Sequence, residues 1–481
     1  MIHINNNIQS IISALIFLNA IILITFIVLE RKKPEKTIAW LFLFIILPPL
    51  GVLLYMFLGR NWKFHKLRDN FSPQIQDLIN GAIKKLNHPE FLPLIELLGN
   101  NSDSPLFLSN EVKIFKDGQE KFYCLKKELL KAKHHIHLEY YIVKSDNIGI
   151  EIKDILVKKA LEGIKVRFIM DRVGSIKVKG SYIKELKAAG VQVVQYSYFL
   201  APLLRLINTQ INYRNHRKIV VIDGTVGFIG GINIGDEYLG KGKLGYWRDT
   251  HIMVKGDFVL GLQAVFLDDF ITIKEANKEP LFYGEDFTDY FRPIEVADKK
   301  VMQLVKSGPD SKYPSIQQGM LKMITMATHH IYITTPYFVP PESILEALKI
   351  ASLGGIDVRI LFPGTYDHLI VYYASKTYLS DLIKCGVTVY FYDPTAFIHA
   401  KVMTIDSKIS TVGTANMDIR SYELNYEINA VIYDTGVTED LETQFYIDLN
   451  RSTKVTLESY NNTSPIIKAL EAISKVFSSL L

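Results

Sequence analysis

Cysteine is almost absent from this chain, and the absence narrows the kinds of protein that it can be. Cys124 and Cys385 are the only two among 481 residues, so they provide neither a disulfide framework nor a cysteine-based metal centre. A large excess of charge is also lacking, because 55 basic residues stand against 50 acidic ones, for a net charge of +5. Nucleic-acid-binding proteins usually carry a strong basic stripe, so this balance argues against that class and fits contact with an anionic lipid.

Long hydrophobic runs, by contrast, are present at the start of the chain. Residues 8–29 and 37–58 form two nearly uninterrupted apolar runs, joined by a charged turn at residues 31–36. Each run is long enough to cross a hydrocarbon core of about 30 Å, so residues 1–63 are predicted to form a transmembrane helical hairpin. A cleaved signal peptide and a buried core hairpin are the alternatives. A signal peptide has basic residues before its apolar run, but no Lys or Arg precedes the first run here.

One short pattern occurs twice: a His, a Lys two residues later, an Asp five residues after that, and then a Gly-x-x-Asn segment. The two copies consist of His216, Lys218, Asp223 and Asn233, and of His399, Lys401, Asp406 and Asn416. Other segments repeat in the same order, since residues 133–142 match 328–338 and residues 163–170 match 355–362. The chain therefore contains a duplicated domain.

Each repeat alternates apolar strand-like runs with helical stretches, which is typical of an α/β layer with helices on the faces of a sheet. We predict two tandem α/β sandwich domains related by a pseudo-twofold axis, at residues 111–275 and 276–481. Residues 64–110 are expected to be a connector between the apolar hairpin and the first domain.

An apolar stripe at helical spacing ends the chain and predicts an amphipathic helix over residues 466–481. Its members are Ile466, Leu470, Ile473, Phe477 and Leu480. Packing of this stripe against the second domain is the simpler interpretation, and contact with a membrane surface is the alternative.

The doubled motif suits chemistry on a phosphate group. A His and a Lys two residues apart on a strand point to the same side, so they can converge on one ligand. Imidazole serves as nucleophile or acid near neutral pH, and Lys and Asn can hold phosphate oxygens without a metal. We expect His216 and His399 to face one phosphorus atom, one attacking it and the other moving the proton, in either assignment. Asn233 and Asn416 are the predicted phosphate ligands.

Four carboxylates stand at matching frames of the two repeats. Asp249 aligns with Glu427, and this pair is expected to fix the tautomer and ring angle of the histidines; ordinary charges at a strand edge are the alternative. Asp223 and Asp406 each end a strand just before a turn. We expect them to brace that turn by hydrogen bonding rather than to transfer protons.

His134, His135 and His137 look like a metal-binding cluster. The matching positions of the second copy hold His329, His330 and Tyr332. A structural position shared by the two copies is therefore favoured over a metal site.

These motifs are where the chain resembles a known family, the phospholipase D superfamily, over roughly residues 110–460. Within it the chain is similar to the bacterial cardiolipin synthases, in its apolar amino-terminal runs, the stretch 215–238 and the sequence 246–251. The resemblance implies that both His-Lys-Asp triplets are active-site residues, which act through a phosphohistidine without metal or cofactor. It also implies that two phosphatidylglycerol molecules are joined into cardiolipin with release of glycerol, by a multi-pass protein of the cell membrane.

Other functions share part of this pattern. A hydrolytic phospholipase D, or a phosphatidyltransferase that uses serine or ethanolamine, would form the same intermediate. A nuclease of the superfamily disagrees with the apolar hairpin and the small net charge. A non-enzymatic lipid-binding scaffold disagrees with two intact motifs, because a degenerate enzyme is expected to lose one. The motifs imply no particular oligomeric state.

Overall fold

The structure is a computed structural model that describes residues 25, 38, 40–44, 89–196, 213–279 and 286–477. The chain divides into two compact units, one made of Met1–Phe64 with Tyr198–Asn212 and the other of His65–Ser197 with Tyr213–Leu481. Both copies of the motif belong to the second unit. The predicted hairpin at 1–63 and the connector residues 64–88 lie almost entirely outside the described residues. Within the described part, no helix has the length and apolarity needed to cross a bilayer.

The first motif lies in a mixed sheet with the strand order β5-β4-β3-β7-β8-β9, in which β2 also pairs with β9. Strands β3, β4 and β5 run parallel, and β7, β8 and β9 are antiparallel to their neighbours. These strands are β2 (Asn110–Asp117), β3 (His135–Tyr140), β4 (Lys165–Asp171), β5 (Gln192–Tyr196), β7 (Lys218–Ile222), β8 (Val226–Gly230) and β9 (Trp247–Gly256).

The second motif lies in a sheet that repeats this order as β14-β13-β11-β16-β17-β19-β10. Its strands are β10 (Val301–Ser307), β11 (His330–Thr334), β13 (Asp357–Phe362), β14 (Thr388–Tyr392), β16 (Val402–Ile405), β17 (Ile409–Gly413) and β19 (Asn425–Tyr433), with β1 (Leu106–Phe107) and β20 (Ser452–Val455) at the edges. A small separate pair is formed by β12 (Phe338–Val339) and β18 (Met417–Asp418). The prediction of two tandem α/β domains is confirmed.

Helices cover the outer face of each sheet, and a shared core lies between the sheets. The first sheet carries α6 (Gly118–Lys131), α7 (Asn147–Leu161) and α8 (Gly180–Ala188), and the second carries α5 (Leu92–Ser102), α10 (Ser315–Met326), α11 (Glu342–Leu353) and α12 (Leu369–Ile383). Helices α9 (Phe258–Ala276) and α14 (Thr435–Leu449) contribute to the shared core. Alternation along β7 explains the layers: Val220 belongs to the core under the outer helices, while Val221 belongs to the shared core that also contains Ile428 of the second sheet.

Two short strands cross from one half to the other. β6 (Arg214–Asn215), just before the first motif, pairs in parallel with β19 of the second half. β15 (Phe397–Ile398), just before the second motif, pairs in parallel with β9 of the first half. Each motif histidine therefore starts from a strand that is hydrogen-bonded to the opposite half.

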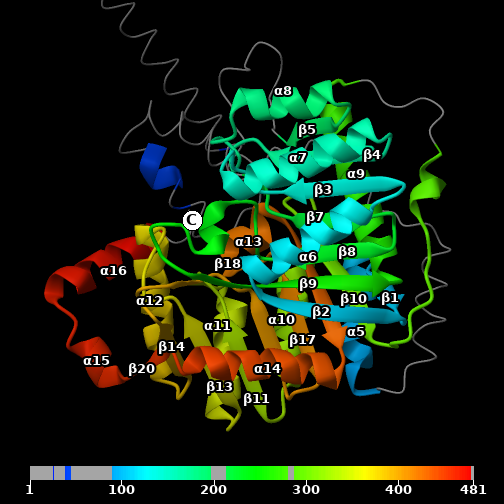
Figure 1. Cartoon of the computed structure of the whole chain (residues 1–481). Coiled ribbons are helices and arrows are strands. Elements are labelled where there is room, and N and C mark those ends of the chain that lie inside the picture. The colour runs from blue at the N-terminus through cyan, green and yellow to red at the C-terminus, as the bar shows by residue number, and fades with distance from the viewer. Residues whose placement is uncertain are drawn as a thin grey trace, which may run out of the picture. The chain divides into compact units, whose positions relative to one another are not determined.

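The chain end shows the opposite orientation from the simpler expectation. Helix α15 (Leu457–Asn461) leads to α16 (Pro465–Phe477), which packs along α12 (Figure 1). The face toward α12 holds buried Glu471, whose carboxylate lies 2.8 Å from the ammonium of Lys376. Ile466 and Ile473 of the apolar stripe are 81% and 57% exposed. Within the described part of the stripe Leu470 is half-buried, whereas Ile466 and Ile473 do not pack on the domain, because the face that does so holds Glu471.

Candidate active site

His216 is held by the strand exchange of the first motif. Its backbone N–H donates to the carbonyl of Tyr426, which continues the pairing of β6 with β19. Glu427 follows on β19, and both of its carboxylate oxygens lie 2.9 Å from Nδ1 of His216. The ring nitrogen Nε2 is the one left for a substrate, because Nδ1 is engaged by the carboxylate.

His399 repeats this arrangement with the halves reversed. Its N–H donates to the carbonyl of Arg248, which extends the pairing of β15 with β9. Asp249 comes next on β9, and its Oδ2 lies 2.7 Å from Nδ1 of His399. Each histidine is thus oriented by a carboxylate from the half that does not carry its own motif.

The two lysines bring both motifs into one site. Lys218 Nζ donates to the carbonyl of His216 at 2.6 Å, and Lys401 Nζ donates to that of His399 at 2.5 Å. Both ammonium groups are buried. They share an electrostatic environment, since Glu427 and Asp249 both act on each lysine and Lys401 acts on Lys218 and His216. Two buried cations beside two imidazoles are groups with the chemistry to bind a phosphate.

Burial sets the protonation states here. It lowers the pKa of His216 to about 4, with Glu427 opposing this and Lys218 adding to it, so the ring is neutral at pH 7. Burial also lowers the pKa of Lys218 to about 7 and that of Lys401 to about 8. For Glu427, burial raises the pKa, but His216 and Lys218 outweigh it and the pKa falls below its ordinary value. The carboxylate therefore stays ionised.

The Gly-x-x-Asn segments support the two carboxylates in different ways. Any Cβ at Gly231 would collide with the carboxylate of Asp249, so the first segment needs glycine for space. In the second segment Thr414 takes the equivalent position, and its hydroxyl donates to Glu427 at 2.5 Å. At equivalent positions, the first half therefore has a glycine that leaves room for the carboxylate, and the second half has a threonine that donates a hydrogen bond to it.

The two predicted phosphate ligands differ in their surroundings. Asn233 accepts from the N–H of Ile142 at 3.1 Å and donates to the hydroxyl of Tyr238 at 2.7 Å, so its amide already joins two loops. Asn416 is also buried, and among the described residues its side-chain oxygen has no hydrogen-bond partner.

Asp223 and Asp406 lie at the far end of their strands from the histidines. The carboxylate of Asp223 accepts from the backbone N–H groups of residues 133–135, and that of Asp406 from those of residues 328–330. Both residues have left-handed backbone angles, with φ of 55° and 53°, which a short polar side chain tolerates in a tight turn. Four to five residues of extended strand separate each from its lysine, or about 15 Å.

The histidines that looked like a metal-binding cluster are engaged in packing. His135 Nε2 and His137 Nδ1 lie 2.9 and 3.2 Å from Oε1 of Gln263 on α9. His330 contacts Glu442 of α14 at 2.9 Å, so the matching position of the second half also faces a helix in the core. Within the described residues no group of three or more His, Cys, Asp or Glu side chains is arranged to hold a metal ion.

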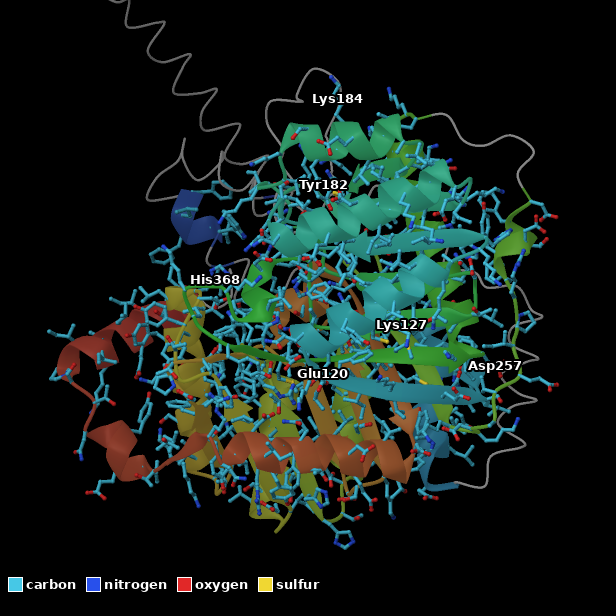
Figure 2. The ribbon with its side chains drawn as sticks, in the orientation of Figure 1. Glu120, Lys127, Tyr182, Lys184, Asp257 and His368 are labelled. Atoms are coloured by element: carbon cyan, nitrogen blue, oxygen red, sulfur yellow. The ribbon has the colours of Figure 1, made fainter. Side chains whose placement is uncertain are left out.

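Aromatic neighbours of the histidines were missed by sequence reasoning. The ring of Tyr141 lies 4.8 Å from that of His216, and Trp247 and Tyr238 lie 5.4 and 6.0 Å from His399. Asp367 accepts from the hydroxyl of Tyr337 and stands next to exposed His368, labelled in Figure 2. Tyr141 and Tyr337 end the matched segments 133–142 and 328–338, so the repeat held a signal for them.

Comparison with known proteins agrees with this geometry. A family model described as cardiolipin synthase, PLD-like domain, matches residues 125–243 and 320–449, and one described as phospholipase D-nuclease N-terminal matches residues 16–60. The cardiolipin synthase of Oceanobacillus iheyensis is 41% identical over 478 residues, which cover 96% of this chain and 97% of that protein. The major cardiolipin synthase ClsA of Bacillus subtilis is 41% identical over 491 residues, covering 99% and 100%.

Among solved structures, a phosphatidylserine synthase of Haemophilus influenzae superposes with a TM-score of 0.62 at 16% identity, covering 81% of this chain and 99% of that one. At this identity the likeness concerns the fold alone. The duplicated sheets and the paired His-Lys motifs define a phospholipase D-like protein. Within that class, the chain belongs to the cardiolipin synthase family.

Proposed function

We propose that the chain makes cardiolipin by a two-step phosphatidyl transfer in which His216 carries the phosphatidyl group. The observation that supports this best is the exchange of carboxylates, which gives each imidazole an orienting partner from the opposite half. A single phosphate bound there would meet two lysine ammonium groups and two oriented ring nitrogens.

In the first step, Nε2 of neutral His216 attacks the phosphorus of phosphatidylglycerol and forms an N–P bond. The P–O bond to the headgroup breaks, and protonated His399 gives its proton to the departing glycerol oxygen. In the second step, the hydroxyl of another phosphatidylglycerol attacks the same phosphorus, its proton passes to His399, and the N–P bond breaks. The products are cardiolipin and glycerol, and both imidazoles return to their starting states.

The electrostatics favour this division of roles. A nucleophile must be unprotonated, and the pKa of His216 is lowered to about 4. The pKa of His399 is also lowered, first by burial and then by Lys401, but two carboxylates, Asp249 and Asp367, oppose this and stabilise the imidazolium when a proton is passed to it. Lys218 and Lys401, with Asn416, would bind the non-bridging oxygens. Asn233, Asp223 and Asp406 serve as braces in this scheme.

We further propose that residues 1–63 anchor the enzyme in the cell membrane as a helical hairpin, followed by a connector at 64–110 and catalytic domains at 111–275 and 276–481. The hydropathy of the two runs supports this, as does the match of residues 16–60 to the amino-terminal family model. Both substrates are lipids, so an anchored enzyme can take them from the bilayer.

The exposed stripe of α16 supplies a second membrane contact in this proposal. Ile466, Ile473 and Val476 are exposed on the side away from α12, which suits insertion at a lipid surface. Replacing Ile473 and Val476 by Asp should weaken flotation with anionic vesicles, while exposed Leu161→Asp on α7 serves as the matched control.

Product analysis tests the reaction. Membranes that bear the full chain are incubated with labelled phosphatidylglycerol, and the lipid and water-soluble products are identified. Cardiolipin with an equal amount of glycerol supports the proposal. Phosphatidic acid as the main product would instead assign a hydrolase, labelled lipid formed only with added serine or ethanolamine would assign another transferase, and no turnover would leave a scaffold.

A further inference from the structure

Arg214 is a buried cation whose charge the proposed mechanism does not use. It lies on β6, two residues before His216, and is only 9% exposed. Its Nη1 donates to the carbonyl of Tyr213 at 2.9 Å, and within the described residues the guanidinium forms no ion pair. Asp171 acts electrostatically on Arg214, but this carboxylate already accepts from the N–H groups of Val173, Gly174 and Asn215. A buried guanidinium with only a shared carboxylate therefore gains from a ligand that supplies a further anion.

A second guanidinium lies close by. Arg420 is half-buried on the short helix α13 (Ile419–Glu423), which begins beside the site after Asp418. A single residue separates helix α13 from β19, whose Asn425 pairs with Arg214. Burial and then the charge of Arg214 lower the pKa of Arg420, while Tyr141, Asp418 and Glu427 oppose this. Both also act on the pKa of Tyr141, whose ring lies 4.8 Å from that of His216. The two arginines thus form a positive region that adjoins the phosphate receptor of His216.

The spacing of this region fits the second lipid of the reaction. Arg214 and His216 lie two residues apart on an extended segment, so their side chains point to the same side. Their Cα atoms are about 7 Å apart. In the acceptor, the attacking hydroxyl is joined to that lipid's own phosphate through the three carbons of glycerol. When this hydroxyl reaches the phosphorus on His216, the acceptor lipid's own phosphate must lie only three carbons away from it. Water or a neutral alcohol has no charged group at that position.

We propose that Arg214 and Arg420 form a second phosphate subsite, which binds the phosphate of the acceptor lipid while the donor phosphate is bound to His216. The inference rests on the proposed function and specifies how its acceptor is selected. The subsite takes no part in proton transfer: the acceptor hydroxyl forms its P–O bond as the N–P bond breaks, and the proton goes to His399. Guanidinium groups suit the task because they bind phosphate oxygens in pairs.

Two reactions of the same enzyme separate this subsite from the donor site. Cardiolipin formation needs the acceptor phosphate, whereas exchange of labelled glycerol into phosphatidylglycerol uses the same phosphatidyl-enzyme with a neutral acceptor. We expect Arg214→Gln and Arg420→Gln each to lower kcat/KM for cardiolipin formation by about tenfold or more, with glycerol exchange within about twofold of the unaltered enzyme. For Arg214→Lys, kcat/KM for cardiolipin formation should lie between the values for the unaltered enzyme and Arg214→Gln, because lysine keeps the charge but loses the paired donors.

Arg451→Gln is the matched control, since Arg451 is a surface arginine paired with Asp393 and should change neither reaction. A parallel fall of both reactions in Arg214→Gln, Arg420→Gln and Arg214→Lys would overturn the subsite, and so would unchanged cardiolipin formation in both Gln variants. Failure of the proposed function looks different, because the unaltered enzyme would then form no cardiolipin whatever residue stands at 214 or 420. Thermal unfolding of each variant shows that the compared proteins are folded.

Discussion

The two halves repeat one backbone plan, yet the surroundings of their histidines differ. His216 has Tyr141 against its ring and arginines nearby, and its own pKa is strongly lowered. His399 is lined by Trp247 and Tyr238, and Asp367 acts on its pKa. The shared backbone fixes where the two rings lie, and the side chains around them fix what each ring can do. A duplicated frame can therefore carry unequal steps of one reaction.

The support of the two carboxylates shows the same contrast on a smaller scale. Asp249 reaches His399 across the space that Gly231 leaves open. Glu427 has a longer side chain, and the hydroxyl of Thr414 holds it against His216. The shorter acid lies beside a glycine and the longer acid beside a threonine, and each of them bonds Nδ1 of its own histidine.

Removal of the histidines is expected to have the largest effect and to break the symmetry. His216→Ala and His399→Ala should each lower cardiolipin formation by on the order of a thousandfold or more. With a phosphatidyl ester of p-nitrophenol, whose leaving group needs no proton, His399→Ala should still form the covalent phosphohistidine and His216→Ala should not. Mass spectrometry of the trapped enzyme measures this; label on residue 399 instead would reverse the assigned roles.

A smaller, unequal effect is expected from the neighbours of the carboxylates. Gly231→Ala places a methyl group against Asp249 and should lower kcat by roughly 30-fold, because the His399 ring loses its alignment. Thr414→Val removes one hydrogen bond to Glu427 without crowding it, and should lower kcat by about three- to tenfold. Equal losses in the two variants would show that steric space and hydrogen bonding matter alike here.

The lysines predict how activity depends on pH. Burial lowers the pKa of Lys218 to about 7 and that of Lys401 to about 8, so both are charged below these values and lose their protons above them. With both charges required, kcat/KM should fall by about 60-fold as the pH rises from 7 to 8.5. Arg stays protonated, so Lys218→Arg should remove the lower of the two transitions even if its absolute activity is reduced. A profile that is flat up to pH 9 would contradict this account.

Asp223 and Asp406 should have the smallest effect on chemistry, although they belong to the repeated motif. Asp223→Ala and Asp406→Ala each leave three backbone N–H groups without an acceptor, which should cost about 2–3 kcal/mol of unfolding free energy. Activity per folded molecule should stay within about twofold, with the Asn variants as the milder controls. Denaturant titration beside active-site quantification distinguishes a brace from a catalyst.

Asp406 also makes a prediction about acid stability. Burial opposes its ionisation, but the backbone N–H groups of residues 328–330 outweigh burial and lower its pKa. A carboxylate with a lowered folded pKa stabilises the fold at neutral pH, and this contribution is lost as the pH falls through that pKa. The difference in stability between the unaltered protein and Asp406→Asn should therefore shrink in acid.

Much of the site could be predicted from the sequence because duplication made positions comparable. The repeat marked both His-Lys pairs, and the matched frame of Asp249 and Glu427 marked both carboxylates before any contact was known. Local pattern also predicted β7 and β16, although His216, His399 and Lys401 lie just before these strands rather than in them. These features depend on neighbouring residues in the chain or on the alignment of one copy with the other.

Other features depend on contacts between distant segments, which local pattern does not contain. The exchange of carboxylates requires β6 to pair with β19 across more than 200 residues. The exposure of the stripe residues Ile466 and Ile473 on α16 accompanies an ion pair between Glu471, on the opposite face, and Lys376 on another helix. Periodicity located this stripe correctly but could not say which face of the helix a distant lysine would attract.

The crossing strands have a consequence for how such a chain can change over time. The acid that serves the first imidazole is inherited with the second half of the gene, and the reverse holds for the other acid. Neither half can evolve independently, because a substitution of the carboxylate in one half changes the surroundings of the histidine in the other half. Fusion of the two copies into one polypeptide keeps these mutually dependent parts in a fixed one-to-one ratio.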